Sequence, residues 1–287
     1  LLVGEPPSSQ RILAAQHEAP NVAWDLQWND ASVGWAVSTT AALPNDPELT
    51  EVRSLIHFDR LPIKELIPPS LQGLLHLEIL ADRLEFEARS TVVFDALGHV
   101  SRFRSTVGLP EAASVKIEGW IDGAELQVLL HYGDVTPMNE PLKLKVGNAL
   151  LSDSLSPQSQ LPNLREGQEW TVETYGPFNR PDTPTKILHA RVEGLTPVDW
   201  EGQQARAWVV VYRSDPGSRL GGEGDVRGKT WVLPDGKVVR QQVKFFNSSM
   251  TFVRFPQIFA DSLVHQHRSD LAKDQLLSPL NEAERKP

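Results

Sequence analysis

Hydrophobic and polar residues alternate along most of this chain, which is the pattern of half-buried β-strands. Two alternating runs flank Asn29-Asp30, a dipeptide typical of tight hairpin turns. Further strand-like runs follow at 51–58, 84–107 and 114–130, and Asp122-Gly123 divides the last of these into a second hairpin. The first half of the chain is therefore predicted to be a succession of antiparallel strands.

The stretch 228–255 has the clearest pattern in the second half. Two apolar and β-branched runs, 230–233 and 238–245, flank Pro234-Asp235-Gly236. Proline presets φ for a turn, and glycine tolerates the positive φ expected at its end. A third run, 250–255, places Met250, Phe252 and Arg254 on one side. The sequence predicts a three-stranded meander here.

An earlier segment repeats the order of this meander. Residues 89–107 also read as a strand, a turn with Asp and Gly, and an alternating strand. The two turn glycines, Gly98 and Gly236, lie 138 positions apart (236 − 98), close to half the chain length. An internal duplication explains this likeness, and so does the general similarity of hairpins in any β protein.

Helical patterns are few and short. Pro68-Pro69-Ser70 precedes leucines with the spacing of one helix face, which predicts a helix near 69–80. A second helix is predicted within 256–273, and a short helical piece within 11–17. The predicted fold class is mainly β, with two curved antiparallel sheets, arranged as half-barrel-like units, and a few short helices.

The sequence predicts five segments, with the connection placed where Pro and Ser residues cluster. These segments are an entry segment (1–20), a first β unit (21–156), a connection (157–165), a second β unit with a C-terminal helix (166–273) and a frayed tail (274–287).

Charge and composition narrow the functional classes. The 287 residues carry a net charge of −9, which argues against a general nucleic-acid binder. The absence of cysteine excludes disulfides, cysteine-ligated zinc and thiol nucleophiles. The sequence has no run of 18 apolar residues, so no transmembrane span is predicted in this chain.

Candidate catalytic and ligand motifs do not meet the requirements of their chemistry. The glycines at 221–224 are followed by Asp225 and a strand, whereas a phosphate loop needs Lys-Ser/Thr and a helix. His265 and His267 point apart if they lie on a helix. No GxSxG motif is present, and no carboxylate pair stands out by its spacing. No catalytic residue, metal site or cofactor is predicted.

Tryptophan is the more informative residue type. Six of the eight tryptophans fall on predicted strands: Trp24, Trp28, Trp35, Trp170, Trp208 and Trp231. They either fill the core or line an apolar cavity between a curved sheet and a helix. In the second interpretation the cavity-lining candidates are Trp170, Trp208 and Trp231.

The segment 231–242, WVLPDGKVVRQQ, carries a family likeness. Together with the order of long strands and a short Pro/Leu-rich helix, it resembles exported bacterial half-barrel proteins related to lipoprotein carriers. It also resembles uncharacterised exported proteins that have a closing WV..DGxVxRQ hairpin. The resemblance implies a curved antiparallel sheet wrapped on a helix, with an apolar groove. No functional residue of the carriers has a matching position in this chain, so none is transferred.

Three functional hypotheses follow. The favoured one is a non-enzymatic, exported or periplasmic binding or interaction module whose ligand is apolar and lipid-like. The second is a structural or accessory domain that binds an envelope protein partner and holds no ligand. The third is a hydrolase whose site the sequence does not reveal. Any signal or anchor is expected upstream of residue 1.

Overall fold

The structure, a computed structural model, describes residues 7–62, 84–108, 114–123, 125–133, 142–145, 157–175, 185–214, 225–245 and 248–273. Most of these residues lie in strands, which confirms the mainly β fold class. The first run of strands is β1 (Asn21–Trp28), β2 (Ala31–Leu43), β3 (Asp46–Leu61), β4 (Leu84–Phe94), β5 (Val100–Gly108), β6 (Val115–Asp122), β7 (Glu125–Tyr132) and β8 (Leu142–Lys145). The second run is β9 (Glu169–Tyr175), β10 (Thr185–Trp200), β11 (Gln203–Ser214), β12 (Val226–Val232), β13 (Val238–Phe245) and β14 (Ser248–Arg254).

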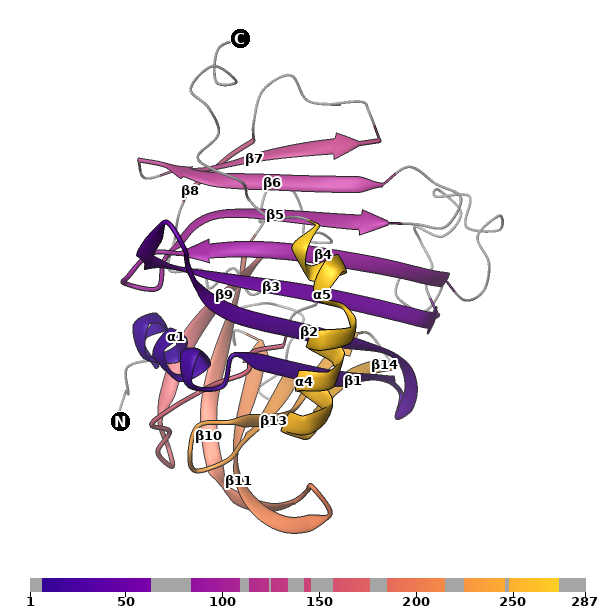
Figure 1. Cartoon of the computed structure of the whole chain (residues 1–287). Helices are drawn as coiled ribbons and strands as arrows, with labels where there is room; N and C mark the ends of the chain where they lie inside the picture. The colour runs from indigo at the N-terminus through magenta and orange to yellow at the C-terminus, as the bar shows by residue number, and fades with distance from the viewer. Residues whose placement is uncertain are drawn as a thin grey trace, which may run out of the picture.

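The two runs form one continuous sheet instead of two separate ones. Its strand order is β8-β7-β6-β5-β4-β3-β2-β1-β14-β13-β12-β11-β10-β9, and neighbouring strands are antiparallel throughout. The first strand of the first run pairs with the last strand of the second run, in register from Trp24↔Arg254 to Trp28↔Met250. This pairing satisfies two strand edges that separate sheets would expose. Figure 1 shows the strands of the second run inclined steeply to those of the first.

The described part of the sheet is not closed into a barrel. Within it, β8 pairs only with β7 and β9 pairs only with β10.

The hairpin turns agree with the sequence prediction. Asn29 and Asp30 have φ of 48° and 66°, so both central residues of the first turn are left-handed, as a type I′ turn requires. Gly123 has φ of 61° between β6 and β7, and Gly236 has φ of 92° between β12 and β13.

The turns around Gly98 and Gly236 share one hydrogen-bonding pattern. The amide of Gly98 donates to Asp95 O, and the amide of Asp95 donates to His99 O. In the later turn Gly236 N donates to Leu233 O, and Leu233 N donates to Lys237 O. This equivalence fits the internal duplication suggested by the sequence, which stays a prediction.

The sheet has two apolar faces with different partners. We call the inner face the one that carries Trp24, Leu26, Phe58, Val210 and Phe252, whose side chains belong to one large buried cluster. We call the outer face the opposite one, on which Ala23, Val37 and Leu55 form a second cluster. The continuous apolar run Val209, Val210 and Val211 is buried on both faces, as the sequence predicts.

Three described helices pack against these faces. The helix α1 (Ser9–Glu18) adds Ile12 to the inner cluster, and α4 (Gln257–Gln266) and α5 (Arg268–Ala272) cover the outer face of β1–β3. Figure 1 shows α4 and α5 in yellow, lying across these strands. The predicted helices at 11–17 and within 256–273 are confirmed, and the one predicted near 69–80 lies outside the described residues.

The segment 157–165, predicted as a connection, is packed into the inner cluster. Leu161 and Leu164 are buried there. Leu161 N donates to Gly236 O at 2.8 Å, and Val238 N donates to Ser159 O at 3.1 Å. The connection between the two runs is therefore part of the core, and it fixes the β12–β13 turn.

Gly236 is expected to tolerate substitution poorly. A Cβ there would lie 2.8 Å from Pro162 Cα, in addition to the strain of the positive φ. We expect Gly236→Ala to lower the free energy of unfolding by about 2 kcal/mol or more, from about 1 kcal/mol of left-handed strain plus overpacking. Chemical denaturation measures this loss.

Gly202→Ala is the matched control, because Gly202 has φ of 74° and nothing within 4 Å of the added Cβ. Its expected cost is about 1 kcal/mol from the backbone alone. Equal losses in the two variants would show that Pro162 does not constrain the turn.

Candidate functional site

A polar hollow lies on the sheet near the start of β9. It has a volume of about 480 Å³ and is lined by Glu166, Gly167, Arg191, Val192, Glu193 and Arg213. Two backbone hydrogen bonds hold its rim to β10, from Gly167 N to Val192 O and from Val192 N to Gln168 O. A register shift follows Val192 in the β10–β11 pairing, and Gly194 has φ of 93° there. This bulge bends β10 beside the hollow.

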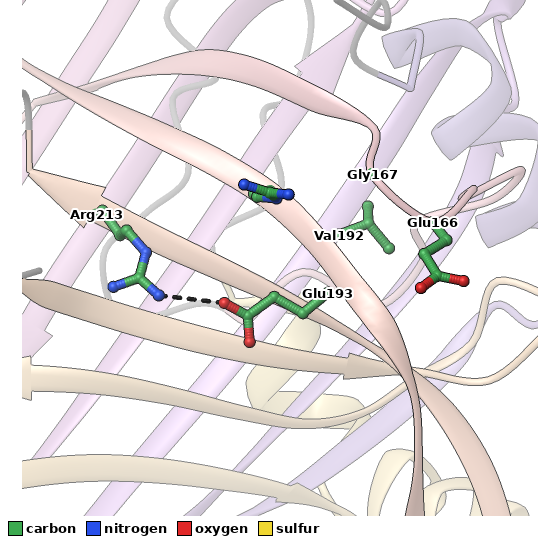
Figure 2. A pocket seen from close by; sticks show the side chains of 6 residues that line it. Glu166, Gly167, Val192, Glu193 and Arg213 are labelled. Carbon is green, nitrogen blue, oxygen red and sulfur yellow. Dashed lines mark hydrogen bonds and ion pairs between the residues drawn. The ribbon is translucent and has the colours of Figure 1, made fainter. Parts of the chain in front are cut away.

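Ion pairs dominate the electrostatics of the hollow. Arg213 Nη2 donates to Glu193 Oε1 at 3.1 Å, and Figure 2 shows these two side chains turned toward each other. Arg191 Nε lies 3.4 Å from Oε1 of Glu169, which belongs to the neighbouring strand β9. The two arginines and two glutamates of the lining balance in charge. The hollow therefore carries no excess charge to select an anion or a cation.

The lining also offers little catalytic chemistry. The lining residues that the structure describes include no Ser, Thr or His to act as nucleophile or proton shuttle. Nor do the described ranges contain a group of three or more His, Asp or Glu side chains placed to hold a metal ion. The lining of this hollow therefore gives no support to the hydrolase hypothesis.

His265 and His267 occupy different positions relative to the last two described helices. His265 lies in the last turn of α4, and His267 lies between α4 and α5. The His267 ring lies 4.5 Å from that of Trp35, and its Nδ1 lies 3.5 Å from Asp270 Oδ2. His267 therefore has a packing role against the outer face.

The three predicted cavity-lining tryptophans do not share a face. Trp170 is buried in the inner cluster, and Trp208 is half-buried at its border. Trp231 pairs with Val209 and Arg240 on the outer face, where the Arg240 guanidinium lies 5.2 Å from its ring. Alternation along β11 and β12 places Trp208 and Trp231 on opposite sides of the sheet. One cavity can therefore be lined by Trp170 and Trp208, but not also by Trp231.

Six half-buried hydrophobic residues border the inner cluster: Phe86, Val107, Val172, Trp208, Tyr212 and Val243. They come from both runs of strands. The Phe86 ring stacks on that of the buried Phe58, with centroids 4.7 Å apart. Tyr212 is half-buried as a whole side chain, but its hydroxyl is shielded from water, and this burial raises its pKa to about 12 against a smaller opposing effect of the hydrogen bond with Thr230. The inner face therefore presents accessible apolar surface beside a packed core.

Arg254 is the unexpected residue of the inner face. It is only 4% exposed, and its Nη1 donates to Ser159 O at 2.9 Å and to Val238 O at 3.2 Å. Burial lowers its pKa to about 10, with a smaller opposing effect of Asp235, so the side chain is charged at neutral pH. The alternation of 250–255 already placed Arg254 beside Met250 and Phe252, and a charge on an apolar face was the signal that it is unusual.

None of the described helices is both long and apolar enough to cross a membrane. This finding concerns only the described ranges of the chain.

Comparison with known proteins identifies no family. No protein-family model and no curated protein matches the chain. Among solved structures, a β-barrel-like protein of a domain of unknown function, DUF1849, from Brucella abortus is 10% identical. The alignment covers 83% of this chain and 96% of that one, with a TM-score of 0.43. The hypothetical lipoprotein YmcC from Escherichia coli is also 10% identical, over 83% of this chain and 88% of its own, with a TM-score of 0.32. Both scores lie below 0.5, so neither likeness carries an inference about this chain.

Trp208 and Trp231, both half-buried, are expected to differ in their contribution to stability. Trp208→Ala removes a ring packed on the inner cluster, which should lower the free energy of unfolding by about 2–3 kcal/mol. Trp231→Ala removes mainly a partly exposed contact with Arg240, expected to cost about 1 kcal/mol. Urea titrations of both variants test this order. A larger loss for Trp231→Ala would contradict the assignment of faces.

Proposed function

We propose that this chain is a non-enzymatic binding or interaction module that holds an apolar, lipid-like ligand against the inner face of its sheet. The observation that carries the proposal is the border of half-buried apolar side chains along the inner cluster. These side chains come from β4 and β5 in the first run of strands and from β9, β11 and β13 in the second, so both runs contribute to the border. Of the three tryptophans that the sequence suggested as cavity-lining, Trp170 and Trp208 lie on this face.

The polar hollow is the weaker ligand site. Its arginines already pair with glutamates, so a charged ligand would have to compete with existing ion pairs. An apolar ligand at the inner face would instead remove partly exposed hydrophobic surface from water, at roughly 25 cal/mol per Å². The hydrophobic effect therefore favours the inner face.

A second candidate function is a structural or accessory domain of a cell-envelope assembly. It is favoured by the complete packing at the centre of the inner cluster, where Leu26 and Phe58 are 0% and 1% exposed. A core filled in this way needs no ligand for stability. An exported location is part of both proposals and rests on the resemblance of segment 231–242 to exported proteins.

Native mass spectrometry of the purified chain tests the ligand. We expect a bound mass that organic extraction removes, and saturable binding of the neutral apolar dye N-phenyl-1-naphthylamine to the extracted protein. Val107→Gln places a polar group on the inner face and should weaken dye binding about tenfold.

The matched control is Ile187→Gln. Ile187 is 44% exposed. Its pair with Glu173 is next to the pair Leu188↔Val172, and Val172 is on the inner face, so alternation places Ile187 on the outer face. It should leave dye binding unchanged. A parent protein without bound mass and without saturable dye binding would support the structural function instead.

A further inference from the structure

Arg254 is a buried cation whose hydrogen bonds are incomplete. Its Nη1 donates to two backbone carbonyls, but its Nη2 is buried and has no hydrogen-bond partner among the described residues. Among the described residues no carboxylate forms an ion pair with Arg254, and the charge of Asp235 acts on its pKa from beyond ion-pair distance, more weakly than burial does. A buried charge without a counterion costs several kcal/mol in general, so buried arginines are usually paired.

Arg254 lies on the inner face of the sheet, where the proposed ligand binds. Its guanidinium carbon lies 5.8 Å from the centroid of the Trp24 ring. Val238, whose carbonyl accepts from Arg254, starts a cross-strand row, Val238–Val232–Trp208, whose first two side chains are fully buried and whose last is half-buried. The unpaired donor and Trp208 of the apolar border therefore lie on the same face of the sheet, three strands apart.

We propose that the inner face binds a long-chain carboxylate, whose carboxyl group pairs with Arg254 Nη2 while its apolar tail lies along the border towards Trp208. This inference rests on the proposed ligand-binding function. A ligand carboxylate would supply a direct ion-pair partner and the acceptor that Nη2 lacks, in the short charge-assisted hydrogen bonds typical of arginine. One negative charge matches one guanidinium, whereas a phosphate monoester would bring a charge of about −1.5 to −2.

A purely structural role explains only part of the Arg254 geometry. Through Nη1 the side chain ties segment 157–165 to β13, since Ser159 O and Val238 O both accept from it. That role uses one nitrogen and does not require the second to remain buried and unpaired. The structural role and the ligand-pairing role predict different ligand affinities. Only the ligand-pairing role makes the protein bind a charged ligand more tightly than its uncharged analogue.

The test compares the fluorescent fatty acid cis-parinaric acid with its uncharged methyl ester. At pH 7 the parent protein should bind the acid about tenfold or more tightly than the ester. Arg254→Met should reduce this ratio to about one, and Arg254→Lys should retain a preference for the acid because it keeps the charge. Laurate should displace the probe better than dodecyl phosphate.

Arg240→Met is the matched control, since it removes an arginine on the adjacent β13 that faces the opposite side of the sheet. It should leave the acid-to-ester ratio unchanged.

Equal affinity of the parent for acid and ester would overturn the carboxylate proposal while leaving apolar binding intact. Binding of neither probe would overturn both, and stronger displacement by dodecyl phosphate would overturn the assignment of the head group. If Arg254→Met does not fold, the acid-to-ester affinity ratios of the parent protein and of Arg254→Lys still test the carboxylate proposal.

Discussion

The pairing of β1 with β14 is the interaction on which the architecture depends. It joins strands that lie more than 200 positions apart in the chain, through five residue pairs from Trp24↔Arg254 to Trp28↔Met250. Without it each run of strands would end in an exposed edge, and the inner face would be divided between two sheets. With it, side chains from β1–β4 and β9–β14 join one buried cluster.

The same pairing sets the chemistry of the two faces. Because side chains alternate along each strand, the register that places Arg254 beside Trp24 also directs Val253 and Asp25 to the outer side. The outer face is then covered over β1–β3 by α4 and α5, which follow directly after β14. The inner face keeps a border of half-buried apolar residues and one buried guanidinium.

Segment 157–165 couples the chain connection to this inner face. Its backbone bonds to the β12–β13 turn, its leucines enter the cluster, and Ser159 O accepts from Arg254. Gln16 of α1 also donates to Ser159 Oγ at 3.1 Å. The segment therefore links α1, the turn at Gly236 and Arg254, so the surroundings of the proposed ligand site depend on elements that are distant in sequence.

Local physical chemistry made much of the fold predictable. Alternation with period two marked the strands, Asn29-Asp30 and Pro234-Asp235-Gly236 marked turns with positive φ, and the apolar run 209–211 marked a strand buried on both faces. These features depend on neighbours within a few residues, where steric limits on φ and side-chain periodicity act directly. The placement of Arg254 on the side of Met250 and Phe252 was also readable from the strand pattern.

Tertiary structure alone decided how these pieces meet. The sequence predicted two sheets, because the free edges of β1 and β14 carry no local signal that they will pair. It grouped Trp170, Trp208 and Trp231, because register between strands fixes which face a side chain takes, and a shift of one residue reverses it. The two carbonyls that bind Arg254 come from residues 159 and 238, so both its partners and its unpaired nitrogen were set by packing between distant segments.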